Sequence, residues 1–349
     1  MVSTADKPDR SPVMKATSGS MTRASATIKT IAAATGFSIA TVSRALSGGS
    51  PMREATREEI LATAKRLGYH QDRAAVRLKT GRTQVIAFVL NREDRLHAFA
   101  RLMLLGISDG LINSGYHLIV VPEQPGESPL DTVRYLVERR AADGLILTHT
   151  QPQDPRVKYL SEVGMPFVTH GRTEMVTPHS YCDFANETFA YQATQALIAR
   201  GRTRIRVILP PARNTYRGHI LDGYSRAMHE AGLPRLIAEG VDLNTLPEQL
   251  HAYADTVWQD CDAFFIPEET AALPVISLLQ RRGRVIGSDV DIAIKQLTSI
   301  GDYLNLPLIR FKENLQQAGG IMAEQILQLI RSSEQPEPLP VLTHLQLPQ

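Results

Sequence analysis

The sequence predicts an α/β protein with a small helical headpiece at its N-terminus and a larger body of two lobes, each built on a doubly wound parallel sheet. Three observations support this fold class. Two short amphipathic stretches flank Gly36, and apolar runs alternate with helical stretches from Thr83 onward. The chain has 349 residues and 43% hydrophobic content, which is more than one small domain needs. We therefore expect a headpiece and a body with separate cores.

The segment from Thr27 to Leu46 predicts two short helices joined by a tight turn. Gly36 can adopt the positive φ that such a turn requires, and Ser38 can cap the first amides of the second helix. The residues of the second helix that can face inward are Val42, Ala45 and Leu46. Two helices with this spacing are typical of a helix-turn-helix motif.

The outer face of the second helix combines short side chains with one long one, Arg44. Short side chains let a helix lie deep in the major groove, where Arg44 can donate two hydrogen bonds to guanine O6 and N7. Such a contact discriminates between bases by about 1–3 kcal/mol. The short residues of this face are Ile39, Ala40, Thr41 and Ser43. The alternative interpretation is an ordinary helical hairpin with a solvated arginine.

Positive charge is concentrated at the N-terminal end of the chain. Residues 1–83 carry 14 Lys or Arg and 6 Asp or Glu, a net charge of +8, whereas the whole chain carries +2. Residues 84–349 therefore carry −6. A run of charge by itself usually marks a solvated face, but beside a helix-turn-helix it favours binding to DNA phosphates with release of counterions. Double-stranded DNA is thus the expected partner.

Two further segments complete the predicted N-terminal part. Thr56 can cap a third helix, with Glu59 at the spacing of a capping box, and Gly68 can end that helix. The basic stretch from Arg73 to Leu78 is either a helix that folds only on DNA or a plain linker. The predicted divisions are a disordered tail at 1–26, a headpiece at 27–72, a hinge helix or linker at 73–83, and a body of two lobes at 84–349.

Other classes of protein are disfavoured by what the sequence lacks. The first 25 residues are polar and contain no apolar core of a secretion signal, and no apolar run approaches the ~20 residues of a membrane span. Cys182 and Cys261 lie far apart, which favours two thiols in a reducing compartment. No metal-ligand spacing, nucleophile elbow or phosphate loop occurs. We expect a cytoplasmic protein with no enzymatic activity, metal or cofactor.

The N-terminal part also matches a known signature, in register and without gaps. The matching residues are Thr27, Ile28, Ala32, Gly36, Ser38, Thr41, Val42, Ser43, Arg44, Thr56, Arg57, Gly68, Tyr69, Ala75, Leu78, Arg82 and Thr83. In these residues the chain resembles the lactose-repressor family of transcription factors. The resemblance implies a homodimer whose recognition helices occupy successive major grooves of a pseudo-palindromic operator, while its hinge helices meet in the minor groove.

The resemblance also implies roles for single residues. Leu78 matches the apolar wedge that kinks the duplex between two base pairs. Ile39 and Ala40 match the positions that vary operator choice, and Ser47 lies just past the recognition helix. His70, Gln71 and Asp72 replace the usual Pro-Asn before the hinge. The expected DNA-binding residues are Thr27, Ile28, Ser38, Ile39, Ala40, Thr41, Ser43, Arg44, Ser47, Thr56, Tyr69, Ala75 and Leu78.

The body shows the alternation of buried strands and helices that indicates repeated βαβ units. The expected strands are Val85–Leu90, Leu118–Val121, Leu145–Leu147, Phe167–Thr169, Ile205–Leu209, Phe264–Ile266, Asp291–Ile294 and a closing strand at Val341–Leu347. The expected helices are Ala98–Ser114, Glu187–Arg200, Tyr224–Ala231, Ala271–Gln280 and Leu315–Ile330. The body resembles periplasmic sugar-binding proteins, which implies a ligand in the cleft between the lobes. The tail lacks leucine heptads, so we expect a dimer rather than a tetramer.

Loops that follow the strands supply the candidate effector-binding residues. Asp154 matches a family position that receives ligand hydroxyls, and Ile220 stands where the family usually carries an arginine, so Arg217 or His219 would replace it. The candidates are Arg95, His97, Phe99, His149, Asp154, Arg172, Arg217, His219, Glu268, Lys295 and Gln296. Each has an alternative role as a solvated loop residue, as a capping group or in an ion pair between the lobes.

A polar cleft in a chain with only 6% aromatic residues suits a hydrophilic small molecule. Asp, Glu, Arg and Lys side chains can each bind two neighbouring sugar hydroxyls. We therefore expect a repressor of carbohydrate-uptake or catabolic genes that a sugar or sugar-derivative inducer relieves. The alternatives are a regulator that needs a nucleobase corepressor and a sugar-binding protein of the same body fold that does not bind DNA.

Overall fold

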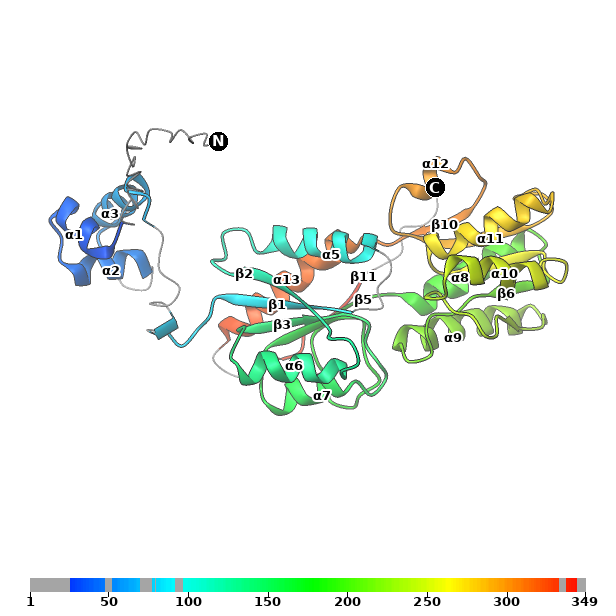
Figure 1. Ribbon diagram of the computed structural model, residues 1–349, viewed down its shortest axis with the longest axis horizontal. Helices are drawn as coiled ribbons and strands as arrows, with labels where there is room; N and C mark the ends of the chain where they lie inside the picture. Colours follow the sequence, from blue (N-terminus) through cyan, green and yellow to red (C-terminus); the bar gives the residue numbers. More distant parts are fainter. Residues whose placement is uncertain are drawn as a thin grey trace, which may run out of the picture. The chain divides into compact units, whose positions relative to one another are not determined.

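The computed structural model describes residues 26–47, 52–69, 77–78, 80–91, 97–332 and 337–343, without the side chains of Ser47 and His97. The chain divides into two compact units after residue 79 (Figure 1). Three helices of the N-terminal unit lie wholly within its described residues, and Arg77 and Leu78 are also helical. The three helices are α1 (Ile28–Thr35), α2 (Ile39–Ser47) and α3 (Glu54–Arg66). The larger unit contains two parallel β-sheets with helices on both faces.

The three helices of the N-terminal unit pack around a small apolar core. Its buried members are Ile31, Val42, Ala45, Ile60 and Ala64. Val42 and Ala45 have exposed fractions of 0% and 3%, and Leu46 packs beside them. The predicted inward face of the second helix is therefore confirmed.

The turn between α1 and α2 follows from local sequence. Gly36 has a φ of 72° and its N–H donates to the Ala32 carbonyl, which ends α1. The Ser38 hydroxyl oxygen accepts a hydrogen bond of 3.1 Å from the Thr41 N–H at the start of α2. Both predictions, the turn glycine and the capping serine, are confirmed.

The predicted cap of the third helix is wrong. α3 begins at Glu54, two residues before Thr56, and no side chain caps it. Glu54 places a carboxylate in the first turn, where it interacts favourably with the helix dipole, so the helix can start without a capping box. Thr56 consequently lies inside the first turn and is half-buried.

Two all-parallel sheets form the frame of the larger unit. In the described residues the first sheet has the strand order β11-β5-β4-β3-β1-β2, and the second has the order β10-β9-β8-β6-β7. The strands of the first sheet are β1 (Val85–Leu90), β2 (His117–Pro122), β3 (Gly144–Leu147), β4 (Phe167–His170), β5 (Tyr181–Phe184) and β11 (Pro340–Thr343). Those of the second are β6 (Ile205–Val207), β7 (Leu236–Ile237), β8 (Ala263–Ile266), β9 (Asp291–Gln296) and β10 (Ile309–Lys312).

Helices cover both faces of each sheet, as the doubly wound prediction requires. The first sheet carries α5 (His97–Gly110) and α13 (Leu315–Arg331) on one face and α6 (Pro129–Glu138) and α7 (Pro155–Glu162) on the other (Figure 1). The second sheet carries α8 (Asn186–Ala199) and α9 (Thr215–Glu230) on one face and α10 (Pro247–Val257) and α11 (Glu269–Arg281) on the other. A short helix, α12 (Ile300–Tyr303), precedes β10.

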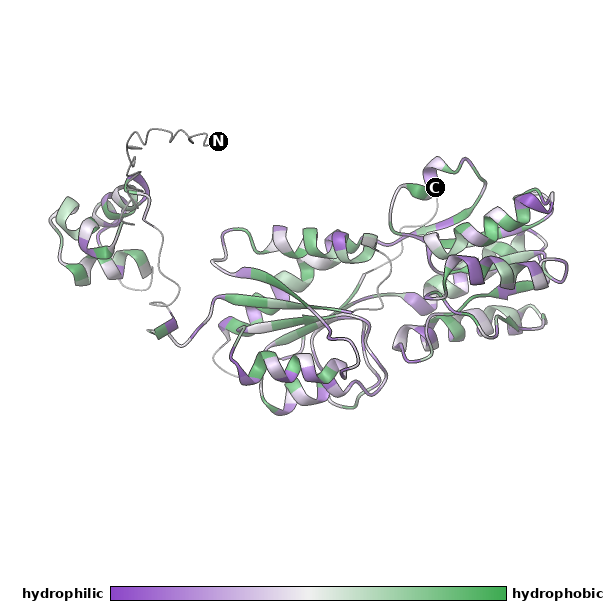
Figure 2. Ribbon diagram, viewed as in Figure 1, coloured by the Kyte–Doolittle hydropathy of each residue, from purple (hydrophilic) through white to green (hydrophobic). Residues whose placement is uncertain are grey.

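The alternation of side chains along β1 explains the two cores of the first lobe. Ile86 and Phe88 pack against α5 and α13, whereas Ala87 and Val89 pack against α6 and α7. All four side chains have an exposed fraction of 0%, which is typical of a parallel strand covered on both faces. Figure 2 shows the apolar residues gathered along these central strands.

Several elements were absent from the sequence prediction because their apolar pattern is short or interrupted. They are β5, β7, β10, α6, α7, α10 and α12. The predicted helix at Tyr224 starts earlier, at Thr215. The prediction missed its first two turns because they are polar and include Gly218. Arg217 and His219 therefore lie on α9 rather than on a loop. The predicted closing strand is present as β11, and residues 344–347 lie outside the described residues.

Helices α5 and α13 approach closely at Gly106. A Cβ added to Gly106 would lie 1.9 Å from the Gln316 carbonyl oxygen, so any side chain there would push the helices apart. We expect Gly106→Ala to lower the free energy of unfolding by about 1–3 kcal/mol, the usual range for overpacking. Chemical denaturation measures the change. The control is Ser108→Ala on the exposed side of α5, for which a change within about 0.5 kcal/mol is expected. Equal stability of Gly106→Ala and the unmodified chain would contradict the close packing.

Candidate ligand-binding cavity between the lobes

The chain passes from the first sheet to the second between β5 and α8, and it returns between β10 and α13. Where the carboxyl ends of the strands of the two sheets meet, residues from both lobes line a cavity of about 120 Å³. Its titratable lining residues are His149, His170, Asp183, Tyr216, Glu268, Lys295 and Glu313. The carboxyl ends of parallel strands are where open α/β sheets bind ligands.

A buried lysine of β9, Lys295, contacts residues at both points where the chain crosses between the sheets. The Lys295 ammonium, at the end of β9, lies 2.9 Å from Glu313 Oε2 and donates a 2.7 Å hydrogen bond to Asn186 Oδ1. The other carboxylate oxygen of Glu313 lies 3.4 Å from His170 Nε2. The side chains of Lys295 and Glu313 are 8% and 5% exposed, so each charge depends on its partner for stability.

Two of the buried carboxylates that line the cavity, Glu313 and Asp183, have pKa values shifted in opposite directions. Burial alone would raise the pKa of Glu313, but Lys295 and His170 lower it to about 2, so this side chain stays ionised. Burial raises the pKa of Asp183, and the charges of His170 and Arg172 offset only part of that effect. Asp183 Oδ2 lies 3.7 Å from Arg172 Nε, within ion-pair range, but accepts no hydrogen bond from the described residues. It is therefore an acceptor that a ligand hydroxyl can use.

Three rings form one wall of the cavity. The rings of His149 and His170 pack in T-shaped arrangements against Phe99, on α5, with ring-centroid distances of 5.3 and 5.4 Å. Burial and the nearby Arg156 lower the pKa of His149 to about 3, so its ring is neutral at pH 7. A neutral imidazole offers one donor and one acceptor. The wall thus combines an apolar surface with the uncharged hydrogen-bonding ring of His149.

Four of the predicted effector-binding residues line the cavity. They are Phe99, His149, Glu268 and Lys295. Glu268 also caps α11, because its carboxylate accepts hydrogen bonds from the N–H groups of Thr270 and Ala271. Burial raises the pKa of this carboxyl group.

The other described candidates lie outside the cavity lining, and each has a partner of its own. Asp154 is fully buried and paired with Arg156. Arg217 donates to the Pro210 carbonyl, and Gln296 donates to the Thr298 carbonyl. The guanidinium of Arg172 donates to His219 Nε2 at 3.2 Å and so joins the two lobes. Arg95 and the side chain of His97 lie outside the described residues.

Sequence reasoning missed several cavity residues, of which Asp183, Asn186 and Glu313 matter most. Asp183 lies in β5 and Glu313 directly follows β10, and neither strand was predicted. A charged residue at the carboxyl end of a short apolar run was the available signal. It was too weak to use because Asp183 interrupts the run itself.

The N-terminal unit presents the outer face of α2. Ile39 is 52% exposed and Arg44 is also exposed, so both can reach a partner. Ala40 is exposed, whereas Thr41 and Ser43 are half-buried.

The remaining predicted DNA-binding residues differ in their surroundings. Thr27 caps α1, and Ile28 and Tyr69 pack against the small core. Leu78 is 90% exposed. Ala75 and the side chain of Ser47 lie outside the described residues.

Two features are absent from the described residues. No helix there has both the length and the apolar composition that a bilayer crossing needs. Within the same residues, no group of three or more His, Cys, Asp or Glu side chains is arranged to hold a metal ion.

Two family profiles match this chain. The profile described as periplasmic binding proteins and sugar binding domain of LacI family matches residues 83–343. The profile described as bacterial regulatory proteins, lacI family, matches residues 27–72. Together they cover both units of the structure.

Individual relatives agree with these matches. The HTH-type transcriptional regulator CelR of Thermobifida fusca is 28% identical over 340 residues, which are 91% of this chain and 96% of that one. The HTH-type transcriptional regulator RafR of Escherichia coli is 36% identical over 211 residues. That match spans 59% of this chain and 62% of RafR, which is less than two thirds of its length.

Solved structures show the same fold. A complex of the transcriptional regulator CelR with cellobiose has a TM-score of 0.66 and 25% identity, and the match covers 93% of this chain and 98% of that one. The lac repressor dimer bound to operator and the anti-inducer ONPF has a TM-score of 0.73 and 19% identity, covering 92% and 96%. The relatives are transcriptional regulators and not enzymes. The chain therefore belongs to the LacI family of bacterial regulatory proteins.

Proposed function

We propose that this regulator is a cytoplasmic homodimer that represses carbohydrate-uptake or catabolic genes and is released from a pseudo-palindromic operator by a sugar or sugar-derivative inducer. The observation that carries the proposal is the cavity, because both lobes line it and it combines a ring wall with an acceptor, Asp183 Oδ2, that accepts no hydrogen bond from the described residues. A ligand bound there contacts both lobes at once. It can therefore favour one arrangement of the lobes over another.

The chemistry of the cavity suits a sugar better than a flat nucleobase. Phe99 offers an apolar surface to the carbon face of a pyranose ring, and Asp183 Oδ2 offers an acceptor to a hydroxyl group. His149, neutral at pH 7, can donate to or accept from a further hydroxyl. The similarity to CelR, whose structure contains cellobiose, supports the same class of ligand.

The proposed direction of control follows from linkage. An inducer must bind the DNA-free arrangement of the dimer more tightly than the DNA-bound one, and couplings of this kind usually change affinity about 5- to 150-fold. A corepressor would do the reverse. The sign of the effect on operator affinity therefore separates the two candidate mechanisms.

The test is a DNA-binding titration with the full chain and an operator selected by the protein from random duplex DNA. Cellobiose, maltose and a panel of monosaccharides are added, with guanine and hypoxanthine as the competing class. We expect one sugar to lower operator affinity at least fivefold. Operator affinity that is unchanged by every sugar and raised by a purine would overturn the inducer proposal and establish the corepressor instead.

A further inference from the structure

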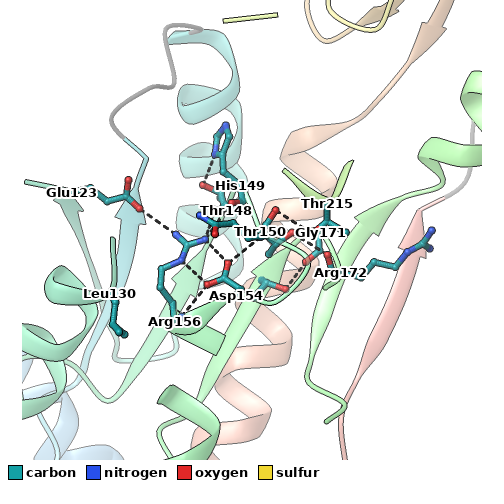
Figure 3. Close-up of polar contacts among 12 residues, drawn as sticks. Glu123, Leu130, Thr148, His149, Thr150, Asp154, Arg156, Gly171, Arg172 and Thr215 are labelled. Atoms are coloured by element: carbon teal, nitrogen blue, oxygen red, sulfur yellow. Dashed lines mark hydrogen bonds and ion pairs between the residues drawn. The ribbon is translucent and has the colours of Figure 1, made fainter. Parts of the chain in front are cut away.

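A buried arginine, Arg156, lies in the first lobe, outside the residues that line the cavity. Arg156 is only 2% exposed, and its guanidinium binds two carboxylates. Its Nε and Nη2 atoms donate to the two oxygens of Asp154 at 3.1 and 2.8 Å, and Nη1 donates to Glu123 at 3.2 Å. Figure 3 shows the guanidinium between Glu123 and Asp154. Asp154 is thus occupied by Arg156 rather than turned to the cavity.

The same guanidinium also binds the backbone of the loop that follows β3. Nη2 donates to the carbonyl oxygens of Thr148 at 3.1 Å and His149 at 3.2 Å (Figure 3). His149 has a φ of 54°, in the left-handed region that residues other than glycine rarely adopt. Two hydrogen bonds from a buried cation stabilise this unusual backbone conformation, which places the His149 ring against Phe99.

The next residue connects this loop to the second lobe. The Thr150 carbonyl oxygen accepts hydrogen bonds from the Thr215 N–H at 2.9 Å and from the Thr215 hydroxyl at 3.2 Å. Thr215 is the first residue of α9, and the first amides of a helix have no acceptor within the helix. A carbonyl of the first lobe therefore satisfies the start of a helix in the second lobe.

We propose that Arg156 is a positioning residue that fixes both contacts of this loop, with His149 held at the cavity and Thr150 held against α9. The contact of His149 with a ligand rests on the proposed inducer site. The contact with α9 is independent of any ligand. The Arg156 side chain thereby connects the cavity wall at His149 with the contact between the lobes at Thr150.

The geometry requires arginine in particular. The guanidinium reaches five acceptor atoms that lie around it, which are two oxygens of Asp154, one of Glu123 and the carbonyls of Thr148 and His149. Its donors are fixed in one planar fork, whereas a lysine ammonium has three donors at a single point. A lysine can preserve the charge but cannot reach the carboxylates and both carbonyls together.

The test measures hydrogen–deuterium exchange at the Thr215 amide in the full chain without sugar. Arg156→Met alone would leave two buried carboxylates unpaired, so the main variant is E123Q/D154N/R156M, which removes all three charges together. Asp154→Asn keeps a side chain that can cap α7. We expect the Thr215 amide to exchange roughly tenfold faster than in the unmodified chain, while the Lys158 amide within α7 stays protected.

Two single variants complete the experiment. Arg156→Lys is expected to fold and still to expose the Thr215 amide, because charge without the fork does not hold the loop. Lys158→Met, on the exposed side of the same helix, is expected to exchange like the unmodified chain. Unchanged Thr215 exchange in Arg156→Lys and in the folded triple variant would overturn the proposal. Failure of every sugar to bind would contradict the inducer site but would leave the exchange result standing.

Discussion

Replacing Lys295 by Met is expected to lower the free energy of unfolding of the body by about 3–5 kcal/mol, because it leaves the Glu313 carboxylate buried without its main partner. Chemical denaturation followed by circular dichroism measures the change. The matched control is Lys158→Met, which removes an exposed lysine whose pair with Glu162 spans 4.0 Å, and a change within about 0.5 kcal/mol is expected.

The unmodified chain and Lys295→Met are expected to differ in how their stability changes with pH. In the unmodified chain the pKa of Glu313 is about 2 in the folded state against an ordinary value of 4.5. Its ion pair therefore contributes stability that is fully present above pH 4.5 and is lost as the pH falls towards 2. In Lys295→Met, burial is expected to raise the pKa of Glu313, so this variant should become more stable as the pH is lowered from 7.5 to 5.5.

A double variant separates the lost charge pair from lost packing. K295M/E313Q removes both charges, and we expect it to recover most of the stability that Lys295→Met loses. If the double variant were as unstable as the single one at every pH, the ion pair would not be the cause. A fall in the stability of Lys295→Met on acidification from pH 7.5 to 5.5 would also contradict the argument.

Arg44→Ala is expected to relax base preference at one position of each operator half-site. One bidentate contact with guanine discriminates by about 1–3 kcal/mol, and the proposed dimer makes it twice. Binding to operators substituted at single positions, compared with the unmodified chain at fixed salt, measures the loss. We expect the variant to distinguish guanine from the other bases about 5- to 150-fold less at that position, counted per half-site.

The control for this prediction is Arg66→Ala, at the exposed end of α3. Removing a cation that reads no base should change affinity for all operators equally and leave the order of preference intact. If Arg44→Ala kept the base preference of the unmodified chain at every position, Arg44 would not be a base-reading residue. Both variants retain the core residues of the headpiece, so loss of folding is not expected.

Local sequence was enough to predict the headpiece motif and the central strands. The turn at Gly36 and the cap at Ser38 depend on contacts within four residues, so the sequence around them specifies them. Strands such as β1 and β3 are short, uninterrupted apolar runs because helices cover both of their faces. Local signals were weaker where polar residues interrupt an element, as Asp183 does in β5 and Gly218 does in α9.

The sequence by itself determined a helix-turn-helix headpiece and a two-lobed body, because these follow from apolar periodicity and turn residues, and it predicted that a ligand site would lie at the carboxyl ends of strands. Only the tertiary structure decided which carboxylates face the cavity. Asp154 was the sequence candidate, but Arg156 donates hydrogen bonds to both of its oxygens and also to Glu123, which directly follows β2 and lies 33 residues earlier in the chain. Asp183, in an unpredicted strand, accepts no hydrogen bond at Oδ2 from the described residues, and Arg172 Nε lies 3.7 Å from this oxygen. Whether a buried carboxylate is occupied or available depends on which cation the fold places beside it, and local sequence does not contain that information.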